Sequence, residues 1–275
     1  MKQAGFSLIE MLLTCFLGAL LLSIMAEIFV NNQQTNRAQS ALLELQENAQ
    51  FAEKILSAAI MPAGLMLCGP LSTTALPAFS IQDNVITVRK INSSVTNIKS
   101  ILNPDKIVVN NINPHYKSND TILVTNCIHA NILSILSVKN SVDTQTLQVA
   151  KQAIPNFSLG ALVGLWQQDR FYLAKSRVKN SYALYQEDTH HQKNELITDV
   201  MDWSIEGLIQ QHWELASHIS RWNEVNAIKI HLLLRSQQPI FKHPEQYYFC
   251  GKLIRAKDNY LYREFTFFIP INIST

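Results

Sequence analysis

The first 29 residues, MKQAGFSLIEMLLTCFLGALLLSIMAEIF (Met1–Phe29), decide how the rest of the chain is organised. Between Phe6 and Val30 only Glu10 and Glu27 are charged. As a helix that rises about 1.5 Å per residue, this run is long enough to cross a bilayer core of about 30 Å. We therefore predict a membrane helix at the N-terminus.

An ordinary cleaved signal peptide does not fit this stretch. Only one basic side chain, Lys2, precedes the apolar run, and no site of the small-x-small type closes it. We expect the helix to remain in the mature protein. Because Lys2 lies on its N-terminal side and the next basic residue is Arg37, we expect a cytoplasmic N-terminus and place everything after about residue 31 outside the cytoplasm.

Glu10 is the unusual residue of this helix, since a carboxylate inside hydrocarbon is costly. Its side chain can snorkel to the headgroups, or it can find a cation within the membrane. No Lys or Arg lies between Phe6 and Asn36, so this segment does not supply that cation. A cut between Gly5 and Phe6 would free an α-amino group, which can pair with Glu10 of a neighbouring chain. Glycine before the cut suits an extended, accessible scissile segment.

Lys2, Gly5 and the stretch FSLIE (Phe6–Glu10), followed by an apolar helix, resemble the class III signal of type IV prepilins. The resemblance implies that a prepilin peptidase cuts between Gly5 and Phe6 on the cytoplasmic side. It also implies N-methylation of Phe6 and packing of the apolar helix into the core of a filament.

Small side chains recur at helical spacing within the apolar run. Because small residues let helix backbones approach closely in lipid, we predict helix packing along them. Such stripes are common in membrane helices, so the pattern by itself is weak support. The predicted packing residues are Thr14, Cys15, Gly18, Ala19 and Ser23.

After Val30 the sequence becomes polar, but an apolar stripe continues with steps of four and three. Pro62 and Gly64 end the pattern, and no helix breaker precedes them after Asn31. We therefore predict one helix from about residue 7 to 61; a cytosolic coiled coil is excluded because the stripe continues directly from a membrane span. The stripe consists of Ala38, Leu42, Leu45, Ala49, Ala52, Leu56 and Ala59.

From Leu65 onward, short apolar alternations separated by Asn, Pro, Asp and Ser predict strands. Many strands after one long helix indicate an α+β fold with an antiparallel sheet. Turn signals are Asn103-Pro104-Asp105 and Asn113-Pro114. The predicted strands are Val85–Ile91, Lys106–Val109, Thr121–Cys127, Ile132–Val138, Ala161–Gln167, Phe171–Lys175, Ala227–Leu234 and Tyr260–Phe268.

Several later segments carry a narrower resemblance. They are LQENAQFAEKIL and AGLMLCG near the helix end, NDTILVTNCIHANILSI, NELITDVMDWSIEGLI, NEVNAIKIHLLLRS and the final YLYREFTFFIPI. These segments are similar to those of the PilW family of minor pilins. The resemblance implies a type IV pilin-like fold. It divides the chain into a leader peptide (1–5), a long helix (6–61, with 6–30 in the membrane and 31–61 periplasmic) and a periplasmic β-rich domain (62–275).

This resemblance implies a structural protein and not an enzyme, without a cofactor. Its expected function is initiation of type IV pilus assembly within a tip or priming complex, in support of twitching motility. The implied location is the inner membrane, single-pass, and then the pilus. The implied partners are other minor pilins, the major pilin, the prepilin peptidase, the inner-membrane assembly platform, a tip adhesin and the lipid bilayer.

Two other functions fit parts of the same sequence. A minor pseudopilin of a type II secretion system would use the same N-terminal physics. A membrane-anchored periplasmic enzyme or binding module would need a constellation that the sequence lacks, since no phosphate loop, nucleophile elbow or paired-cysteine zinc pattern is present. With a net charge of +2 and no dense Lys/Arg tract, the chain gives no reason to predict nucleic acid as a partner.

Three of the four cysteines, Cys68, Cys127 and Cys250, are expected outside the cytoplasm, where disulfides persist. The resemblance favours Cys68–Cys127, because these two occupy the positions similar to PilW. Pairing of Cys250 with either of them, or three unpaired thiols, remains open.

Histidines and tryptophans are the remaining candidates for a site. Asp188 and the adjacent His190-His191 could touch a cation, but the polar stretch indicates an exposed loop, and we predict no metal. Trp203, Trp213 and Trp222 are predicted to be buried core in preference to a recognition surface.

Overall fold

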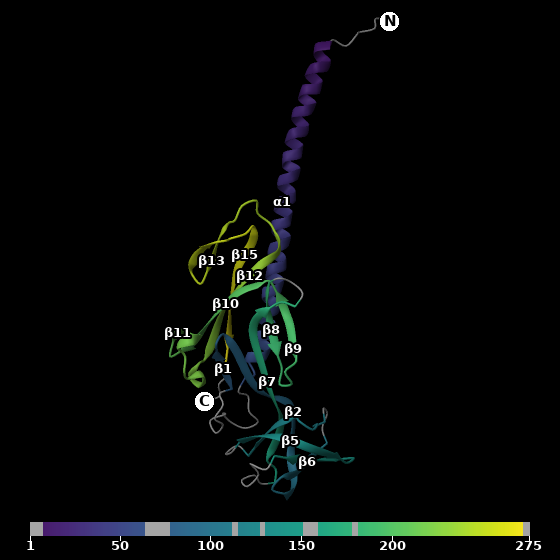
Figure 1. Ribbon diagram of the computed structural model, residues 1–275, viewed down its shortest axis with the longest axis vertical. Coiled ribbons are helices and arrows are strands. Elements are labelled where there is room, and N and C mark those ends of the chain that lie inside the picture. Colours follow the sequence, from purple (N-terminus) through teal and green to yellow (C-terminus); the bar gives the residue numbers. More distant parts are fainter. Residues whose placement is uncertain are drawn as a thin grey trace. The chain divides into compact units, whose positions relative to one another are not determined.

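The computed structural model describes residues 8–63, 78–111, 115–126, 130–150, 159–177 and 181–271. It contains one long helix and antiparallel β-sheet, which confirms the predicted α+β class (Figure 1). The chain divides into two compact units. The smaller unit contains the helix up to Glu47 together with Arg235–Arg263, and the larger contains Asn48–Leu234 together with the chain from Glu264.

Helix α1 runs without interruption from Leu8 to Ile60. A turn at residues 61–63 follows it, in which the Met61 amide donates to Ser57 O at 2.9 Å. The prediction of one continuous helix is therefore confirmed. Its apolar stripe is also confirmed, because alternating steps of three and four place these side chains on one face. The stripe residues that are buried are Leu45, Ala49, Ala52, Leu56 and Ala59, with Ala38 and Leu42 half-buried.

Nine strands of the larger unit form one hydrogen-bonded arrangement. Their order is β1-β2-β3-β6-β5-β4-β7-β8-β9, with a further pairing of β2 with β7. Every neighbouring pair is antiparallel. The strands are β1 (Phe79–Gln82), β2 (Val85–Asn103), β3 (Lys106–Asn110), β4 (Thr121–Thr125), β5 (Ala130–Asn140), β6 (Thr144–Val149), β7 (Leu162–Lys175), β8 (Tyr182–Glu187) and β9 (Lys193–Thr198).

The two long strands β2 and β7 take part in two structures. Residues 86–91 of β2 pair with 166–171 of β7, within an open sheet that also contains β1, β8 and β9. After a register shift, residues 95–97 pair with 162–164, and this second contact joins the two ends of the series β2-β3-β6-β5-β4-β7. The six strands therefore close into a small barrel, which we call the β2–β7 barrel.

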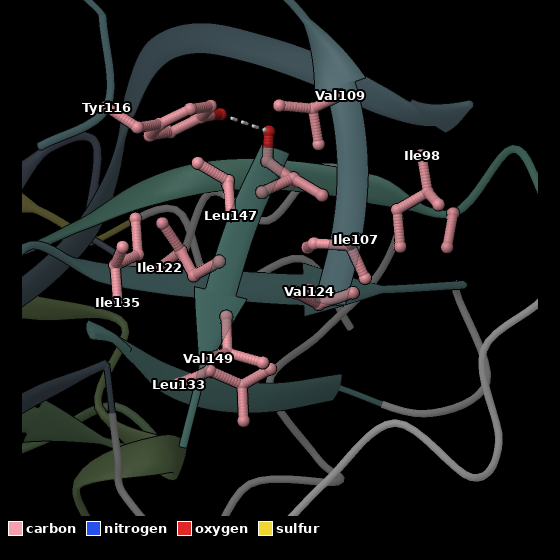
Figure 2. Close-up of a cluster of buried hydrophobic side chains, with 12 residues drawn as sticks. Ile98, Ile107, Val109, Tyr116, Ile122, Val124, Leu133, Ile135, Leu147 and Val149 are labelled. Atoms are coloured by element: carbon pink, nitrogen blue, oxygen red, sulfur yellow. Dashed lines mark hydrogen bonds between the residues drawn. The ribbon is translucent and has the colours of Figure 1, made fainter. Parts of the chain in front are cut away.

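The β2–β7 barrel is filled by aliphatic side chains and one tyrosine (Figure 2). Tyr116 donates from its hydroxyl to Val163 O at 3.1 Å, and burial raises its pKa. Gln145, fully buried, accepts from the Tyr116 amide at 3.2 Å through Oε1 and donates to Asn140 Oδ1 at 2.7 Å. The polar groups beside Tyr116 are therefore paired inside an apolar core. That core contains Ile98, Ile107, Val109, Ile122, Val124, Leu133, Ile135, Leu147, Val149, Ala161 and Val163.

A second sheet has the order β11-β10-β12-β15. Its strands are β10 (Val200–Ile209), β11 (His212–Leu215), β12 (Ala227–Pro239) and β15 (Tyr260–Pro270), and the 3-10 helices η2 (Ala216–His218) and η3 (Trp222–Glu224) follow β11. Gly207 in β10 packs closely against two side chains. A methyl group added there would approach Ile219 Cδ1 to 2.6 Å and Val225 Cγ1 to 3.2 Å, so the Ile219 side chain would have to shift.

The two short strands β13 (Gln246–Phe249) and β14 (Lys252–Arg255) form a hairpin in the smaller unit. Its two-residue turn consists of Cys250 and Gly251, with φ of 49° and 74°. Positive φ at both central residues is the signature of a type I′ turn, whose twist matches that of the strands it joins. The turn leaves Cys250 exposed at the tip.

Most predicted strands fall within observed ones, and two predictions are wrong in detail. The strand predicted as Thr121–Cys127 ends at Thr125, the last residue of β4. The separate strands Ala161–Gln167 and Phe171–Lys175 are one strand, β7. The polar residues between them do not break it, because Asp169 pairs with Lys90 Nζ at 3.2 Å across the sheet. The turn at Asn103-Pro104-Asp105 is confirmed between β2 and β3, while Asn113-Pro114 lies outside the described residues.

Two of the three tryptophan predictions are confirmed and one is wrong. Trp203 and Trp222 are buried. Trp213 is 38% exposed, because it lies on β11, an edge strand of the second sheet whose four residues are all exposed. Apolar alternation alone does not distinguish an edge strand from an interior one.

Candidate assembly site

The described part of the predicted assembly site begins in the first turn of α1. Gly5 and Phe6 lie outside the described residues, and so do Cys68 and Cys127. The cleavage site, the methylated terminus and the disulfide therefore remain predictions. Glu10, Cys15 and the other predicted packing residues are all placed on the helix.

Glu10 is exposed in the first turn of α1. Within the described residues its carboxylate has no ion-pair or hydrogen-bond partner. A negative charge is favourable near the N-terminus of a helix, because the unpaired amides there carry partial positive charge. The helix end therefore tolerates Glu10 and leaves its carboxylate accessible to another chain.

The helix from Ile9 to Val30 exposes apolar side chains on every side. A helix that is apolar all round is normally buried, either in lipid or among other helices. By its length and composition, α1 can cross a membrane, and none of its apolar stretch is buried within the chain. The exposed large side chains are Ile9, Met11, Leu12, Leu13, Phe16, Leu17, Leu20, Leu21, Leu22, Ile24, Met25, Ile28, Phe29 and Val30.

The two hydroxyl groups of the small-residue stripe bond within the helix. Thr14 Oγ1 donates to Met11 O at 2.9 Å, and Ser23 Oγ donates to Leu20 O at 2.8 Å. A methyl group added at Gly18 would meet nothing within 4 Å, so the helix has an open notch there. The stripe therefore offers a close-approach surface with its polar groups already satisfied.

The comparisons with known proteins concern this same end of the chain. Residues 1–26 match the sequence model described as the prokaryotic N-terminal methylation motif. This match supports a type IV prepilin-like protein. The motif is typical of structural proteins anchored in a membrane through an apolar N-terminal helix. No curated protein and no solved structure matches the chain.

A charged network on the second sheet was not anticipated from the sequence. His231 Nδ1 lies 2.5 Å from Glu264 Oε1, and His231 Nε2 lies 3.7 Å from Glu206 Oε1. Lys229 Nζ forms an ion pair with Glu206, and Thr266 Oγ1 lies 3.1 Å from His231 Nδ1. The alternation A-I-K-I-H in β12 could have indicated that Lys229 and His231 share the outward face.

Two aromatic rings lie beside this network. Trp213 and Phe268 have ring centroids 5.7 Å apart, and the Lys229 ammonium lies 4.8 Å from the Trp213 centroid. These groups neutralise one another's charge across three strands. They form a surface of paired charges and aromatic rings.

The loop between β8 and β9 is a tight turn, as predicted for an exposed segment. Asp188 Oδ1 accepts from the amides of His190 and Gln192, both at 2.9 Å. His191 Nδ1 lies 2.8 Å from Glu187 Oε1. This hydrogen bond, and then the charge of Arg170, hold the pKa of Glu187 below its usual range. The carboxylates at this turn are therefore occupied in holding it.

A pocket of about 120 Å³ lies between β4, β7 and the β8–β9 turn. Three of its lining residues are acidic, Asp120, Asp169 and Asp188. Asp120 Oδ2 accepts from the Lys117 amide at 2.8 Å, and Asp169 pairs with Lys90. Asp120 and Asp188 therefore stabilise turns, and Asp169 stabilises the pairing of β2 with β7.

Proposed function

We propose that the protein is a minor pilin of the PilW type that takes part in the initiation of type IV pilus assembly, within a tip or priming complex. One observation carries the proposal: an apolar helix, exposed on every side, extends from a prepilin-type N-terminus into a β-rich region. Such a helix needs a partner that the chain itself does not provide.

The mechanism is association by helix packing. Cleavage after Gly5 leaves a charged amine at Phe6, and this amine pairs with Glu10 of the adjacent subunit. The pairing neutralises both charges in a low-dielectric environment and fixes the axial register of the two helices. The helix then packs with other minor pilins and the major pilin in the inner membrane, and the β-rich region lies in the periplasm as a type IV pilin-like domain.

The segments similar to PilW favour a pilus over a secretion pseudopilus. Because minor pilins and minor pseudopilins share the prepilin-type N-terminal helix, the N-terminus does not separate them, but deletion of the protein does. We expect loss of surface pili and twitching, with secretion of exoproteins unchanged. Loss of secretion with normal piliation would instead identify a minor pseudopilin.

The N-terminus of the mature protein tests the proposal directly. We would express the full chain with and without a prepilin peptidase and determine the intact mass. The expected product lacks Met1–Gly5 and carries one extra methyl group. Gly5→Val should remain uncleaved, whereas Glu10→Ala should be cleaved normally. A mature protein that still begins at Met1, or that begins after the apolar run, would contradict the proposal.

We also propose the Cys68–Cys127 disulfide in the periplasmic region. Peptide mapping of the protein without reductant should recover these two cysteines in one linked peptide. Linkage of either cysteine to Cys250 would replace this pairing with one of its alternatives.

A further inference from the structure

The segment Arg235–Arg263 carries an unusual share of the positive charge. It holds six basic and two acidic residues, a net charge of +4, whereas the rest of the chain has 17 basic and 19 acidic residues. The basic residues are spaced along the segment, so the charge becomes concentrated only when the segment folds. This segment contains the β13–β14 hairpin and belongs to the same compact unit as α1 up to Glu47.

One basic residue of the segment serves the fold, and the others face solvent. The Arg235 guanidinium lies 3.8 Å from Asp258 Oδ2 and 4.5 Å from the ring centroid of Tyr260. Within the described part of the chain, five other cations form no ion pair. These exposed residues are Lys242, Lys252, Arg255, Lys257 and Arg263.

The two faces of the hairpin differ. On the inner face, Tyr247 stacks on Tyr262 of β15 with centroids 4.6 Å apart. On the outer face, Tyr248 and Leu253 are directly opposite each other and are 64% and 53% exposed. Arg255 lies two residues along from Leu253 and shares this outer face. The outer face therefore combines a tyrosine, an aliphatic side chain and a cation.

This combination matches the chemistry of the boundary between lipid and water. Tyrosine rings lie at the headgroup level of membranes, and long basic side chains place apolar stems in lipid and their charge among phosphates. Clustered Lys and Arg near a membrane are attracted to anionic lipids. The 235–263 segment belongs to the same compact unit as the part of α1 up to Glu47, and this part of the helix contains the predicted membrane span.

We propose that the outer face of the β13–β14 hairpin, together with the exposed cations of the Arg235–Arg263 segment, docks on anionic phospholipid headgroups of the membrane that α1 spans. The inference rests on the membrane anchoring in the proposed function. Charge complementarity, and membership of the same compact unit as the apolar helix, favour lipid as the occupant. The docking would hold the subunit against the membrane surface before it enters a filament.

Lysine reactivity in lipid nanodiscs tests the docking. The full chain would be placed in nanodiscs of phosphatidylcholine alone, or of phosphatidylcholine mixed with phosphatidylglycerol. Acetylation rates of Lys242, Lys252 and Lys257 would be followed by mass spectrometry, with Lys106 and Lys139 of the barrel as internal references. We expect these three lysines of the Arg235–Arg263 segment to react about three- to tenfold more slowly in the anionic discs, and salt to remove the difference.

Variants of the apolar pair sharpen this test. Tyr248→Ser with Leu253→Ser should reduce the lysine protection, because the hairpin loses its contact with the lipid interface. Leu136→Ser with Val142→Ser, two exposed barrel residues, is the matched control and should leave the protection unchanged.

Three outcomes separate this inference from the proposed function. Equal lysine reactivity in both kinds of disc, in a chain that is anchored and correctly processed, would overturn the docking alone. Protection in both discs that grows with the number of proteins per disc would also overturn it, in favour of a protein contact. A chain that fails to enter discs of either composition would overturn the membrane anchoring and the docking together.

Discussion

The N-terminal half of α1 and the β2–β7 barrel use apolar side chains in opposite ways. In the barrel, Ile, Val and Leu alternate with polar residues and fill a closed interior. In the helix between Ile9 and Val30, they point outward on every side. The barrel therefore finds its burial within the chain, whereas the helix depends on a membrane or on other helices. Both regions are rich in aliphatic side chains, but those of the barrel pack against the same chain and those of the helix need contacts outside it.

The largest effect is expected when Glu10, the acid at the start of the exposed helix, is removed. Glu10→Ala should reduce incorporation of the subunit into pili by about tenfold or more, since loss of about 1.4 kcal/mol of pairing already gives tenfold. Immunoblots of sheared pili, normalised to the membrane pool, measure the effect. Glu27→Ala, at the other end of the apolar run, is the matched control and should have a smaller effect. Normal incorporation of the Glu10 variant would contradict the pairing.

The second half of α1 should behave like the barrel, because its stripe is buried within the chain. Leu56 is fully buried, so Leu56→Ala should lower the free energy of unfolding by about 2–5 kcal/mol. Phe51, 47% exposed on the same helix, is the control, and Phe51→Ala should change stability by about 0.5 kcal/mol or less. Urea unfolding of the chain starting at Asn31 measures both. Equal losses would show that the stripe is not what holds the helix.

The polar bond inside the barrel should have a smaller effect. Tyr116→Phe removes the donor to Val163 O while keeping the ring, so we expect a loss of about 1 kcal/mol. Tyr248→Phe, on the exposed hairpin, provides the control and should be nearly neutral. A stability loss equal to that of the control would show that Val163 O is satisfied without the hydroxyl.

The smallest effect is that of acid on the β8–β9 turn. The pKa of Glu187 is lowered from 4.5 in the folded state by His191 and Arg170. Its stabilisation is therefore fully present above pH 4.5 and is lost as pH falls through the lower folded pKa. Glu187→Gln should be less stable than the parent by about 1 kcal/mol or less at pH 6, and the difference should shrink below pH 4.5. A difference that is constant across this range would exclude the titration of Glu187 as its cause.

The two regions also differed in how far the sequence predicted them. The continuous helix and its buried stripe followed from spacing, because a helix of this length is determined by local pattern and the absence of breakers. Closure of the barrel did not, because it depends on the second pairing of β2 with β7, between residues about 65 positions apart in the chain. Trp213 was misplaced for a similar reason, since only the sheet order makes β11 an edge.

The candidate site shows the same division. Glu10 and the small-residue stripe could be named from the sequence, because a motif and a helical period define them. The His231–Glu264 pair could not, because neighbouring strands β12 and β15 bring together two charges that lie 33 positions apart in the chain. A site within one helix can be predicted from residue spacing, whereas a site shared by several strands can be predicted only when the strand order is known.

The double use of β2 and β7 makes the barrel a modular insertion. At the point where these strands leave the open sheet, Ile91 and Trp166 are paired directly across from each other. The chain between Ile91 and Trp166 therefore leaves the open sheet, forms the barrel and returns to the same place in the sheet. A chain joined there by a tight turn would keep the ladder of the open sheet. An ancestral domain could thus have gained or lost the barrel without rearranging the strands that support it.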